Sequence, residues 1–445
     1  MIYSGKNAVV LGLGHSGQAA AMLLHEEGAF VTVCESQESD ETRARAGSLR
    51  LRGVNVLLGA EAESDPARYD IAVISPGIDP GVPLVRNVVA KEIPVIGELE
   101  LAFTECSCPV VAITGTNGKT TTTELTTSIL QHAGVRTMAS GNIGLPFSTA
   151  VRQSHELDVM VLEVSSFQLE TIRTFRPQVA AWLNLSPNHL DRYSGMSDYR
   201  AAKLRIFENQ TADDIAVLNA INDLPPLAAR TVTFSAVEGA ADFTLDGTLI
   251  RYRGNPVIDQ GATSLAGVHN AENLMAALGI GLSLHVDLEK LAAGVGGYAP
   301  PSHRCEFVRE LDGISWINDS KATNLDAMEK AIRSQDRPVV LIAGGKDKGF
   351  EFDAIAPVVR ERVRAAVLIG EMKERIAKSW RGVDCAKCGS LEEAVGCAQT
   401  LAESGDVVLF SPGTSSFDMF RNYGERGNHF KSAVQQLSSQ KKTNI

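Results

Sequence analysis

Short apolar runs alternate with helical stretches along the N-terminal part of the chain. The stretch 18–26 has the spacing of a helix, and the alternation pauses near Gly97 before a further predicted helix, 98–104. Strands and helices that alternate in this way form βαβ units with a parallel sheet. The predicted strands of this first series are 8–11, 30–34, 54–58 and 71–75.

Two further series of apolar runs follow. The second begins with the apolar run 109–115 and ends in shorter strands, within 231–258, followed by a helix, 270–284. The third series has the same alternation of strands and helices, so it also predicts a parallel sheet. The other predicted strands are 159–163 and 179–183 in the second series, and 314–317, 339–343, 365–369 and 407–411 in the third.

The segment 296–302 separates the second series from the third. It holds two glycines and two adjacent prolines and is the strongest linker signal in the chain. With 445 residues, the chain is also too long for one ordinary core. We predict an α/β protein of three domains, 1–97, 98–301 and 302–445, with a frayed tail from Ser438.

Charge and composition narrow the class of protein. Lys and Arg total 42 and Asp and Glu total 53, and this net charge of −11 disfavours nucleic acid as a partner. The first residues lack the features of an export signal, and no run of about 18 apolar residues occurs. We expect a cytoplasmic monomer that does not interact with membranes.

The seven cysteines are scattered and odd in number, which is typical of reduced thiols. Cys106 and Cys108 form one close pair, and Cys385 and Cys388 form another. Neither pair has a second pair at the spacing of a zinc site, so we interpret both as structural thiols.

The strongest chemical signal is the glycine-rich segment 115–121, directly after an apolar strand and directly before a helix. Such a loop directs backbone N–H groups and a helix N-terminus at phosphate oxygens. Lys119 supplies a charge for the terminal phosphates, and the Thr120 hydroxyl can bind Mg²⁺. Glu163 ends the apolar strand 159–163, where an acidic partner for that metal is expected. By itself, Glu163 is compatible with a solvated strand end, but together with Lys119 a metal role is favoured.

A second glycine motif, 12–17, follows the first predicted strand and opens a helix. Glu35 ends the next strand, where it can reach a ribose hydroxyl. This pattern indicates a site for a nucleoside diphosphate, either NAD or a UDP-sugar, and a purely structural turn is the alternative. The segment 75–77 ends a later strand at the same sheet edge.

His189 and Lys203 are less specific signals. His189 lies in a polar loop, where a single histidine is more often a surface residue than a ligand. Lys203 shares a face of the predicted helix 199–209 with apolar residues. A lysine there is either desolvated and nucleophilic, or extended so that its amine reaches water.

Polar clusters recur in the third series, each next to a predicted strand or the linker. Cationic groups at several strand ends indicate a cleft for an acidic substrate, and solvated loops are the alternative for each cluster. The clusters are 302–304, 318–324, 344–349 and 411–420.

In this order, the motifs resemble the Mur ligase family, and most narrowly its D-glutamate-adding members. The resemblance spans nearly the whole chain. It depends on 115–121, 163–170, 188–192, 202–203, 269–270 with Asn273, 302–304, 318–324 and 411–420.

The resemblance implies a Rossmann-like N-terminal domain, a central P-loop mononucleotide-binding domain and a Rossmann-like C-terminal domain. It implies an ATP-dependent ligase that adds D-glutamate to UDP-N-acetylmuramoyl-L-alanine through an acyl phosphate, in the peptidoglycan synthesis that supports cell shape and cell division. Two Mg²⁺ ions would assist.

The resemblance also implies a role for individual residues. The catalytic residues would be Lys119, His189 and Lys203. ATP would contact Gly115, Thr116, Asn117, Gly118, Lys119, Thr120, Thr121, Asn270, Asn273, Arg304 and Asp319. Mg²⁺ would be held by Thr120, Glu163, His189 and Lys203, with Lys203 carbamylated. The UDP-sugar would contact Ser16, Glu35, Ser36, Gly77 and Asn142. D-glutamate would contact Lys321, Thr323, Lys348, Ser416 and Tyr423.

Some positions depart from the familiar family pattern. Glu35 stands where aspartate is usual, Tyr423 where phenylalanine is usual, and 413–415 read Gly-Thr-Ser where alanine and cysteine are common. Three other functions compete: a ligase for another amino acid or for folate, an NAD-dependent dehydrogenase, and a non-catalytic nucleotide switch. Lys321 and Lys348 favour a dicarboxylic amino acid, and the loop at 115–121 disfavours the dehydrogenase.

Overall fold

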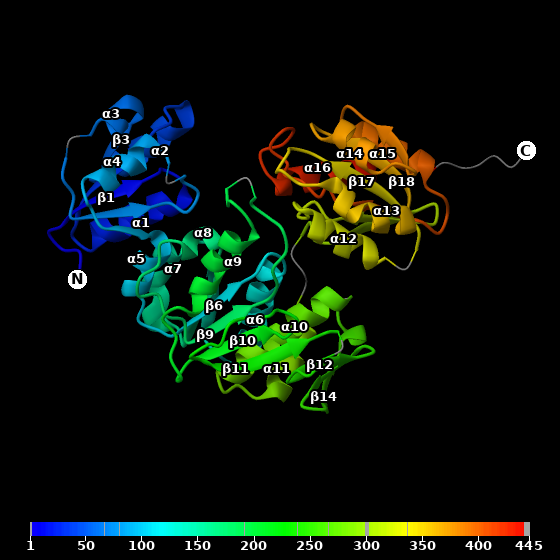
Figure 1. Ribbon diagram of the computed structural model, residues 1–445, viewed down its shortest axis with the longest axis horizontal. Coiled ribbons are helices and arrows are strands. Elements are labelled where there is room, and N and C mark those ends of the chain that lie inside the picture. The colour runs from blue at the N-terminus through cyan, green and yellow to red at the C-terminus, as the bar shows by residue number, and fades with distance from the viewer. Residues whose placement is uncertain are drawn as a thin grey trace, which may run out of the picture. The chain divides into compact units, whose positions relative to one another are not determined.

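The computed structural model describes residues 2–439 except 66, 80, 191, 238, 266, 299–301 and 336. The chain forms three sheets flanked by helices (Figure 1). Residues 299–301 and 440–445 lie outside the described part. The first of these segments belongs to the predicted linker, 296–302, and to the predicted 301/302 boundary. The second belongs to the tail predicted from Ser438. The chain divides into two compact units: the first comprises Met1–Leu185, Ser197–Thr263 and Ala271–Tyr298, and the second Ser186–Met196, Ser264–Asn270 and Ala299–Ile445.

The first sheet has five parallel strands in the order β3-β2-β1-β4-β5. Its central strand, β1, is buried except at its first residue, because helices cover both faces of a parallel sheet. The strand order reverses between β1 and β4, and ligands bind at such a switch point. The elements are β1 Asn7–Leu11, α1 His15–Glu26, β2 Phe30–Glu35, α2 Asp40–Arg50, β3 Asn55–Leu58, α3 Gly59–Glu63, β4 Ile71–Ile74, α4 Pro83–Ala90 and β5 Val95–Gly97.

The second sheet has nine strands in the order β14-β13-β12-β11-β10-β9-β6-β8-β7. Its parallel part, from β7 to β12, continues into an antiparallel tail through β13 and β14. The elements up to the tail are α5 Glu98–Thr104, β6 Val110–Thr114, α6 Lys119–His132, β7 Thr137–Gly141, α7 Phe147–Ala150, β8 Val159–Glu163, α8 Ser166–Leu169, β9 Val179–Trp182, α9 Met196–Leu204, β10 Ile215–Asn219 and β11 Arg230–Ser235. The others are β12 Phe243–Asp246, β13 Leu249–Tyr252, β14 Asn255–Asp259, α10 Val268–Ser283 and α11 Leu288–Val295.

The third sheet has six strands in the order β15-β16-β20-β17-β18-β19, and only its edge strand β15 is antiparallel. The prediction of three α/β domains with parallel sheets is confirmed. The elements are β15 Glu306–Leu311, β16 Ile314–Asn318, α12 Leu325–Arg333, β17 Val339–Gly344, α13 Ala356–Arg362, β18 Val363–Ile369, α14 Lys373–Ser379, β19 Asp384–Lys387, α15 Leu391–Leu401, β20 Val407–Phe410 and α16 Tyr423–Gln436.

One hydrophobic core joins the first sheet to the second. Helix α1 packs against α5 and α7, and apolar side chains of all three helices belong to the same buried cluster. Two polar contacts accompany this packing. The Tyr3 hydroxyl lies 3.1 Å from the Thr104 hydroxyl, and the Arg152 guanidinium lies 2.7 Å from the Glu26 carboxylate.

Glu100, on helix α5, also binds the backbone of a turn, 173–175, that is distant in sequence; we call this contact the clamp. The buried carboxylate of Glu100 accepts backbone N–H bonds from Arg173, Thr174 and Phe175 at 2.8, 2.7 and 3.0 Å. The Thr174 hydroxyl donates a fourth bond at 2.5 Å. A negative charge and four donors thus fix the 173–175 turn on α5.

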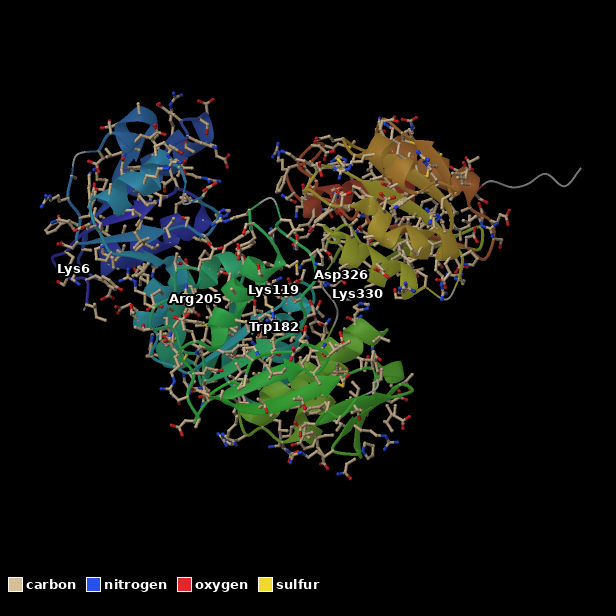
Figure 2. All side chains as sticks on the ribbon, viewed as in Figure 1. Lys6, Lys119, Trp182, Arg205, Asp326 and Lys330 are labelled. Carbon is tan, nitrogen blue, oxygen red and sulfur yellow. The ribbon has the colours of Figure 1, made fainter. Side chains whose placement is uncertain are left out.

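The predicted helix 199–209 was wrong at both ends. Helix α9 begins at Met196 and ends at Leu204, and a 3-10 turn, Arg205–Phe207, follows. Arg205 (Figure 2) lies in this 3-10 turn, where its guanidinium donates to the carbonyls of Leu169, Glu170 and Ile172. Across the residues described, no helix combines the length and the apolar character needed to cross a membrane.

Candidate active site

The glycine-rich loop lies between the buried strand β6 and the helix α6, as predicted. Gly118 caps the helix in the left-handed region, with φ of +83°. A Cβ there would lie 2.3 Å from the Asn273 side-chain oxygen, so both the backbone conformation and the space require glycine. Asn273, on α10, also accepts a hydrogen bond from the Thr122 hydroxyl at 3.2 Å.

Asn184, which the sequence did not single out, holds the loop in place. Its side-chain oxygen accepts the Asn117 N–H at 2.9 Å, and its side-chain amide donates to the Asn117 carbonyl at 3.1 Å. Its backbone carbonyl accepts the Thr116 N–H. The residue follows β9, which neighbours β6, but a single asparagine after a strand carries no sequence signal of this role.

Lys119, labelled in Figure 2, is the first residue of α6. Its amine donates to the carbonyl oxygens of Gly115 and Thr116 at 2.8 and 2.9 Å. Its ammonium charge therefore lies at the helix N-terminus, where an anion is favoured.

Glu163 meets the loop, as predicted from its place at the end of β8. Strands β6 and β8 are parallel neighbours, so both end at the same sheet edge. The Thr120 hydroxyl donates to one Glu163 carboxylate oxygen at 2.7 Å, and the Asn142 amide donates to the other at 2.8 Å. The Thr120 hydroxyl and the Glu163 carboxylate are oxygen ligands of the kind that Mg²⁺ prefers.

Lys203 is fully buried beside the same loop. Its amine donates to the Gly115 carbonyl at 2.9 Å and lies 4.8 Å from the centre of the Tyr199 ring. Burial, reinforced by the charge of Lys119 and opposed by Glu163, holds the pKa of Lys203 well below its usual range. The amine of this lysine is therefore desolvated, and the alternative in which it extends to reach water does not hold.

The glycine motif of the first sheet forms the tight turn that it predicted. Gly12 has φ of +98°, and a Cβ on Gly17 would lie 2.0 Å from the Gly12 carbonyl oxygen. The Glu35 carboxylate accepts the N–H groups of Leu13 and Gln37 at 3.0 and 2.9 Å. Ser16 is half-buried next to this turn.

Three other residues expected at the UDP-sugar lie in different surroundings. Ser36 and Gly77 are exposed, after β2 and β4. Asn142 lies after β7, against Glu163.

In the second unit, Asp319 is the centre of a buried polar cluster. Its carboxylate accepts the Ser411 hydroxyl at 2.8 Å and the Cys305 N–H at 3.2 Å. Burial raises the pKa of Asp319 to about 6, although Ser411, Arg304 and Cys305 oppose the shift. Arg304 is close enough to Asp319 to affect its charge, so these two predicted ATP residues are brought together.

The residues predicted for D-glutamate follow three neighbouring strands, β16, β20 and β17. The Lys321 amine lies 5.6 Å from the centre of the Tyr423 ring. Thr323 and Lys348 are half-buried and Ser416 is buried. Because parallel strands end at one edge, these residues share the edge where such sheets bind ligands.

Arg426, which the sequence analysis missed, supports this edge from α16. Its buried guanidinium donates to the backbone carbonyls of Ser320 and Thr414. Burial lowers the pKa of Arg426 to about 10. An arginine in an amphipathic helix gives no sequence signal of such contacts.

His189 and Asn270 belong to chain segments grouped with the second unit. His189 has φ of +56°, and its N–H donates to the Asn188 side-chain oxygen at 3.0 Å. Asn270 is on the first turn of α10, before the part that carries Asn273. Within the described residues, no group of three or more His, Cys, Asp or Glu side chains is arranged to hold a metal ion.

Three family models match the chain in order. They describe a MurD-like N-terminal domain of Mur ligases (residues 6–97), a Mur ligase middle domain (113–281) and a Mur ligase glutamate ligase domain (303–413). A UDP-N-acetylmuramoylalanine–D-glutamate ligase from Geotalea daltonii is 43% identical, covering 98% of this chain and 99% of that protein. One of the same name from Geobacter metallireducens is 44% identical, with 99% of each chain covered.

The chain belongs to the Mur ligase family. It is accordingly an ATP-dependent ligase that forms amide bonds. Among solved structures, a pseudomurein peptide ligase type C from Methanothermus fervidus matches with a TM-score of 0.62. That match covers 98% of this chain and all of the other at 18% identity, so it shows a shared fold.

Proposed function

We propose that this enzyme joins D-glutamate to UDP-N-acetylmuramoyl-L-alanine at the expense of ATP, a step of peptidoglycan precursor synthesis. The full-length relatives described above carry the name of this activity. The observation that carries the proposal is the cluster of Lys119, Thr120, Glu163 and the buried Lys203 around one glycine-rich loop.

The reaction needs ATP because a carboxylate does not acylate an amine at neutral pH. The substrate carboxylate attacks the terminal phosphorus of ATP, which forms an acyl phosphate and releases ADP. The D-glutamate amine then attacks the acyl carbon, which forms the amide and releases phosphate. Lys119 and the N-terminus of α6 bind and neutralise the terminal phosphates.

Thr120 and Glu163 would hold one Mg²⁺. The Thr120 hydroxyl and a Glu163 carboxylate oxygen are 2.7 Å apart, close enough to bind the same ion. When bound, the ion neutralises charge on the phosphoryl group being transferred. Asn142 orients the Glu163 carboxylate from its other oxygen. His189 and a carbamylated Lys203 would hold a second ion.

Carbamylation of Lys203 requires a neutral amine, and the lowered pKa of this lysine favours that form. The nitrogen lone pair attacks CO₂, an N–C bond forms, and one proton leaves to solvent. The product is an anion, which the charge of Lys119 would stabilise in a site where the ammonium form of Lys203 is disfavoured.

The remaining predicted residues complete the proposal. We propose the domain boundaries 1–97, 98–301 and 302–445. ATP would also contact Asn270, Asn273, Arg304 and Asp319. The UDP-sugar would contact Ser16, Glu35, Ser36, Gly77 and Asn142. D-glutamate would contact Lys321, Thr323, Lys348, Ser416 and Tyr423.

The test is ADP release from ATP, Mg²⁺ and UDP-N-acetylmuramoyl-L-alanine, with D-glutamate, L-glutamate, L-alanine or a diamino acid in separate reactions. We expect turnover only with D-glutamate, and none from Lys119→Met. Turnover with a different amino acid would keep the ligase and overturn the substrate. No turnover in any reaction, from folded protein that binds ATP, would refute the proposed substrates.

A further inference from the structure

The turn that joins α5 to β6 holds two thiols that the ligase chemistry does not use. The sulfur atoms of Cys106 and Cys108 are 3.9 Å apart. Both side chains are half-buried against the core, and Ser107 between them is exposed. The turn is at the start of β6, and the glycine-rich loop follows the other end of that strand.

Hydrogen bonds fix this turn so that the two sulfurs face each other. The Ser107 N–H donates to the Ser154 hydroxyl at 3.2 Å, and the two serine hydroxyls are 2.9 Å apart. The Cys106 thiol lies 3.4 Å from the Cys108 carbonyl oxygen, to which it can donate. A disulfide needs a sulfur separation of about 2.05 Å, so side-chain rotation must bring the sulfurs about 2 Å closer.

The two thiols differ in acidity. The hydrogen bond from Cys108 lowers the pKa of Cys106 to about 7 against the opposing effect of burial, and Ser154 contributes to the shift. The same contact raises the pKa of Cys108, which keeps its proton. By contrast, burial raises the pKa of the Cys34, Cys305 and Cys388 thiols.

We propose that Cys106 and Cys108 form a dithiol that a hydroperoxide oxidises to an intrachain disulfide. The Cys106 thiolate attacks a peroxide oxygen, the O–O bond breaks, and a sulfenic acid forms on Cys106. The Cys108 sulfur then attacks the sulfenic sulfur, the S–S bond forms, and the hydroxyl leaves with the Cys108 proton as water. Two electrons pass from the two sulfurs to hydrogen peroxide, which becomes two molecules of water.

A second pair of cysteines, close in sequence, serves as a control. Cys385 and Cys388 have the spacing common in redox motifs, but burial raises the pKa of both thiols, that of Cys388 to about 11. Because the thiolate is the reactive form, this pair is expected to stay reduced where the first pair is oxidised. Sequence spacing alone would favour the opposite order.

The experiment treats the whole protein with hydrogen peroxide near neutral pH, alkylates the remaining thiols, and analyses the tryptic peptide 92–119 by mass spectrometry. This peptide contains Cys106 and Cys108 and no other cysteine. We expect it to lose the mass of two hydrogens and to resist alkylation, with reversal by dithiothreitol. Cys385 and Cys388 should remain alkylated at the same peroxide dose.

Two variants identify the roles of the thiols. Cys108→Ser should stop at a sulfenic acid on Cys106, which dimedone traps, whereas Cys106→Ser should leave Cys108 unoxidised. Each variant should release ADP at the wild-type rate before oxidation. The proposal is overturned if wild-type protein gives the dimedone adduct instead of the disulfide, or if Cys385 and Cys388 oxidise first.

Discussion

Replacing Glu100 by alanine tests how the turn 173–175 is held. The change removes the acceptor of three backbone N–H groups and one hydroxyl. The Phe175 N–H is buried and would keep no acceptor, whereas the Arg173 and Thr174 groups are partly buried and can recruit water. Most of the lost stability should therefore come from the Phe175 N–H.

The size of the effect follows from these bonds. A hydrogen bond to a charged group contributes about 1.5–3 kcal/mol, and a buried donor left without an acceptor costs about 1–3 kcal/mol. If the buried bond is counted in full and the partly buried bonds at a fraction, the free energy of unfolding should fall by about 3–5 kcal/mol. At roughly 2–4 °C per kcal/mol for a large domain, the Tm should fall by about 6–20 °C.

The assay should report on the first unit alone. Trp182, in β9, is fully buried there, and the other two tryptophans, Trp316 and Trp380, belong to the second unit. Changing those two to phenylalanine leaves Trp182 as the fluorescence probe for urea and thermal unfolding. All comparisons are then made in that background.

Two controls distinguish the clamp from a general effect of burial. Glu100→Gln keeps one acceptor oxygen and should cost less than the alanine change. Glu98→Gln should change the free energy of unfolding little. That carboxyl accepts one backbone N–H, from Ser148, and burial, which raises the pKa of Glu98, disfavours the charge that the substitution removes. A loss below about 1 kcal/mol for Glu100→Ala would refute the reasoning.

Three further predictions concern the active site. Lys203→Met should abolish ADP release without lowering Tm, because an apolar side chain removes the cost of a buried amine; a parallel loss of Tm would make the lysine structural. Glu163→Gln should lower kcat by about 100-fold, which corresponds to roughly 2.7 kcal/mol, and raise the Mg²⁺ concentration for half-maximal rate; an unchanged Mg²⁺ dependence would remove Glu163 from the metal site. The folded-state pKa of Asp319, about 6, lies above its ordinary 3.8, so its protonated form stabilises the fold fully below 3.8 and this contribution is lost by about pH 6. If ATP binding needs the carboxylate, kcat/KM for ATP should fall as pH falls through about 6, and Asp319→Asn should lack that limb of the profile.

The sequence predicts the contact between Thr120 and Glu163 for a physical reason. Both residues follow strongly apolar strands, and adjacent parallel strands place their ends at one edge. The local sequence pattern is therefore enough to predict the glycine-rich loop, the helix that follows it and its acidic partner. Likewise, the apolar face around Lys203 predicts a desolvated amine as one of two alternatives, and only packing decides between them.

Other supports of the site could not be predicted because they act over long stretches of chain. Asn184 holds the loop at Asn117, and Arg426 crosses from the last helix to Ser320. Glu100 clamps a turn more than seventy residues away. Each is a single polar residue without periodicity, so its partner is known only once the sheets are assembled.

The shared core of α1, α5 and α7 has a consequence for fragments and chimaeras of this enzyme. Family models treat residues 6–97 as a separate domain, yet the buried cluster that contains Tyr3 continues through Leu99 to Phe147. A fragment that ends at residue 97 would leave the apolar flank of α1 in water, where it favours aggregation. Exchange of the N-terminal domain between relatives should therefore succeed only when α5 and α7 are exchanged with it, so the transferable module is larger than the domain.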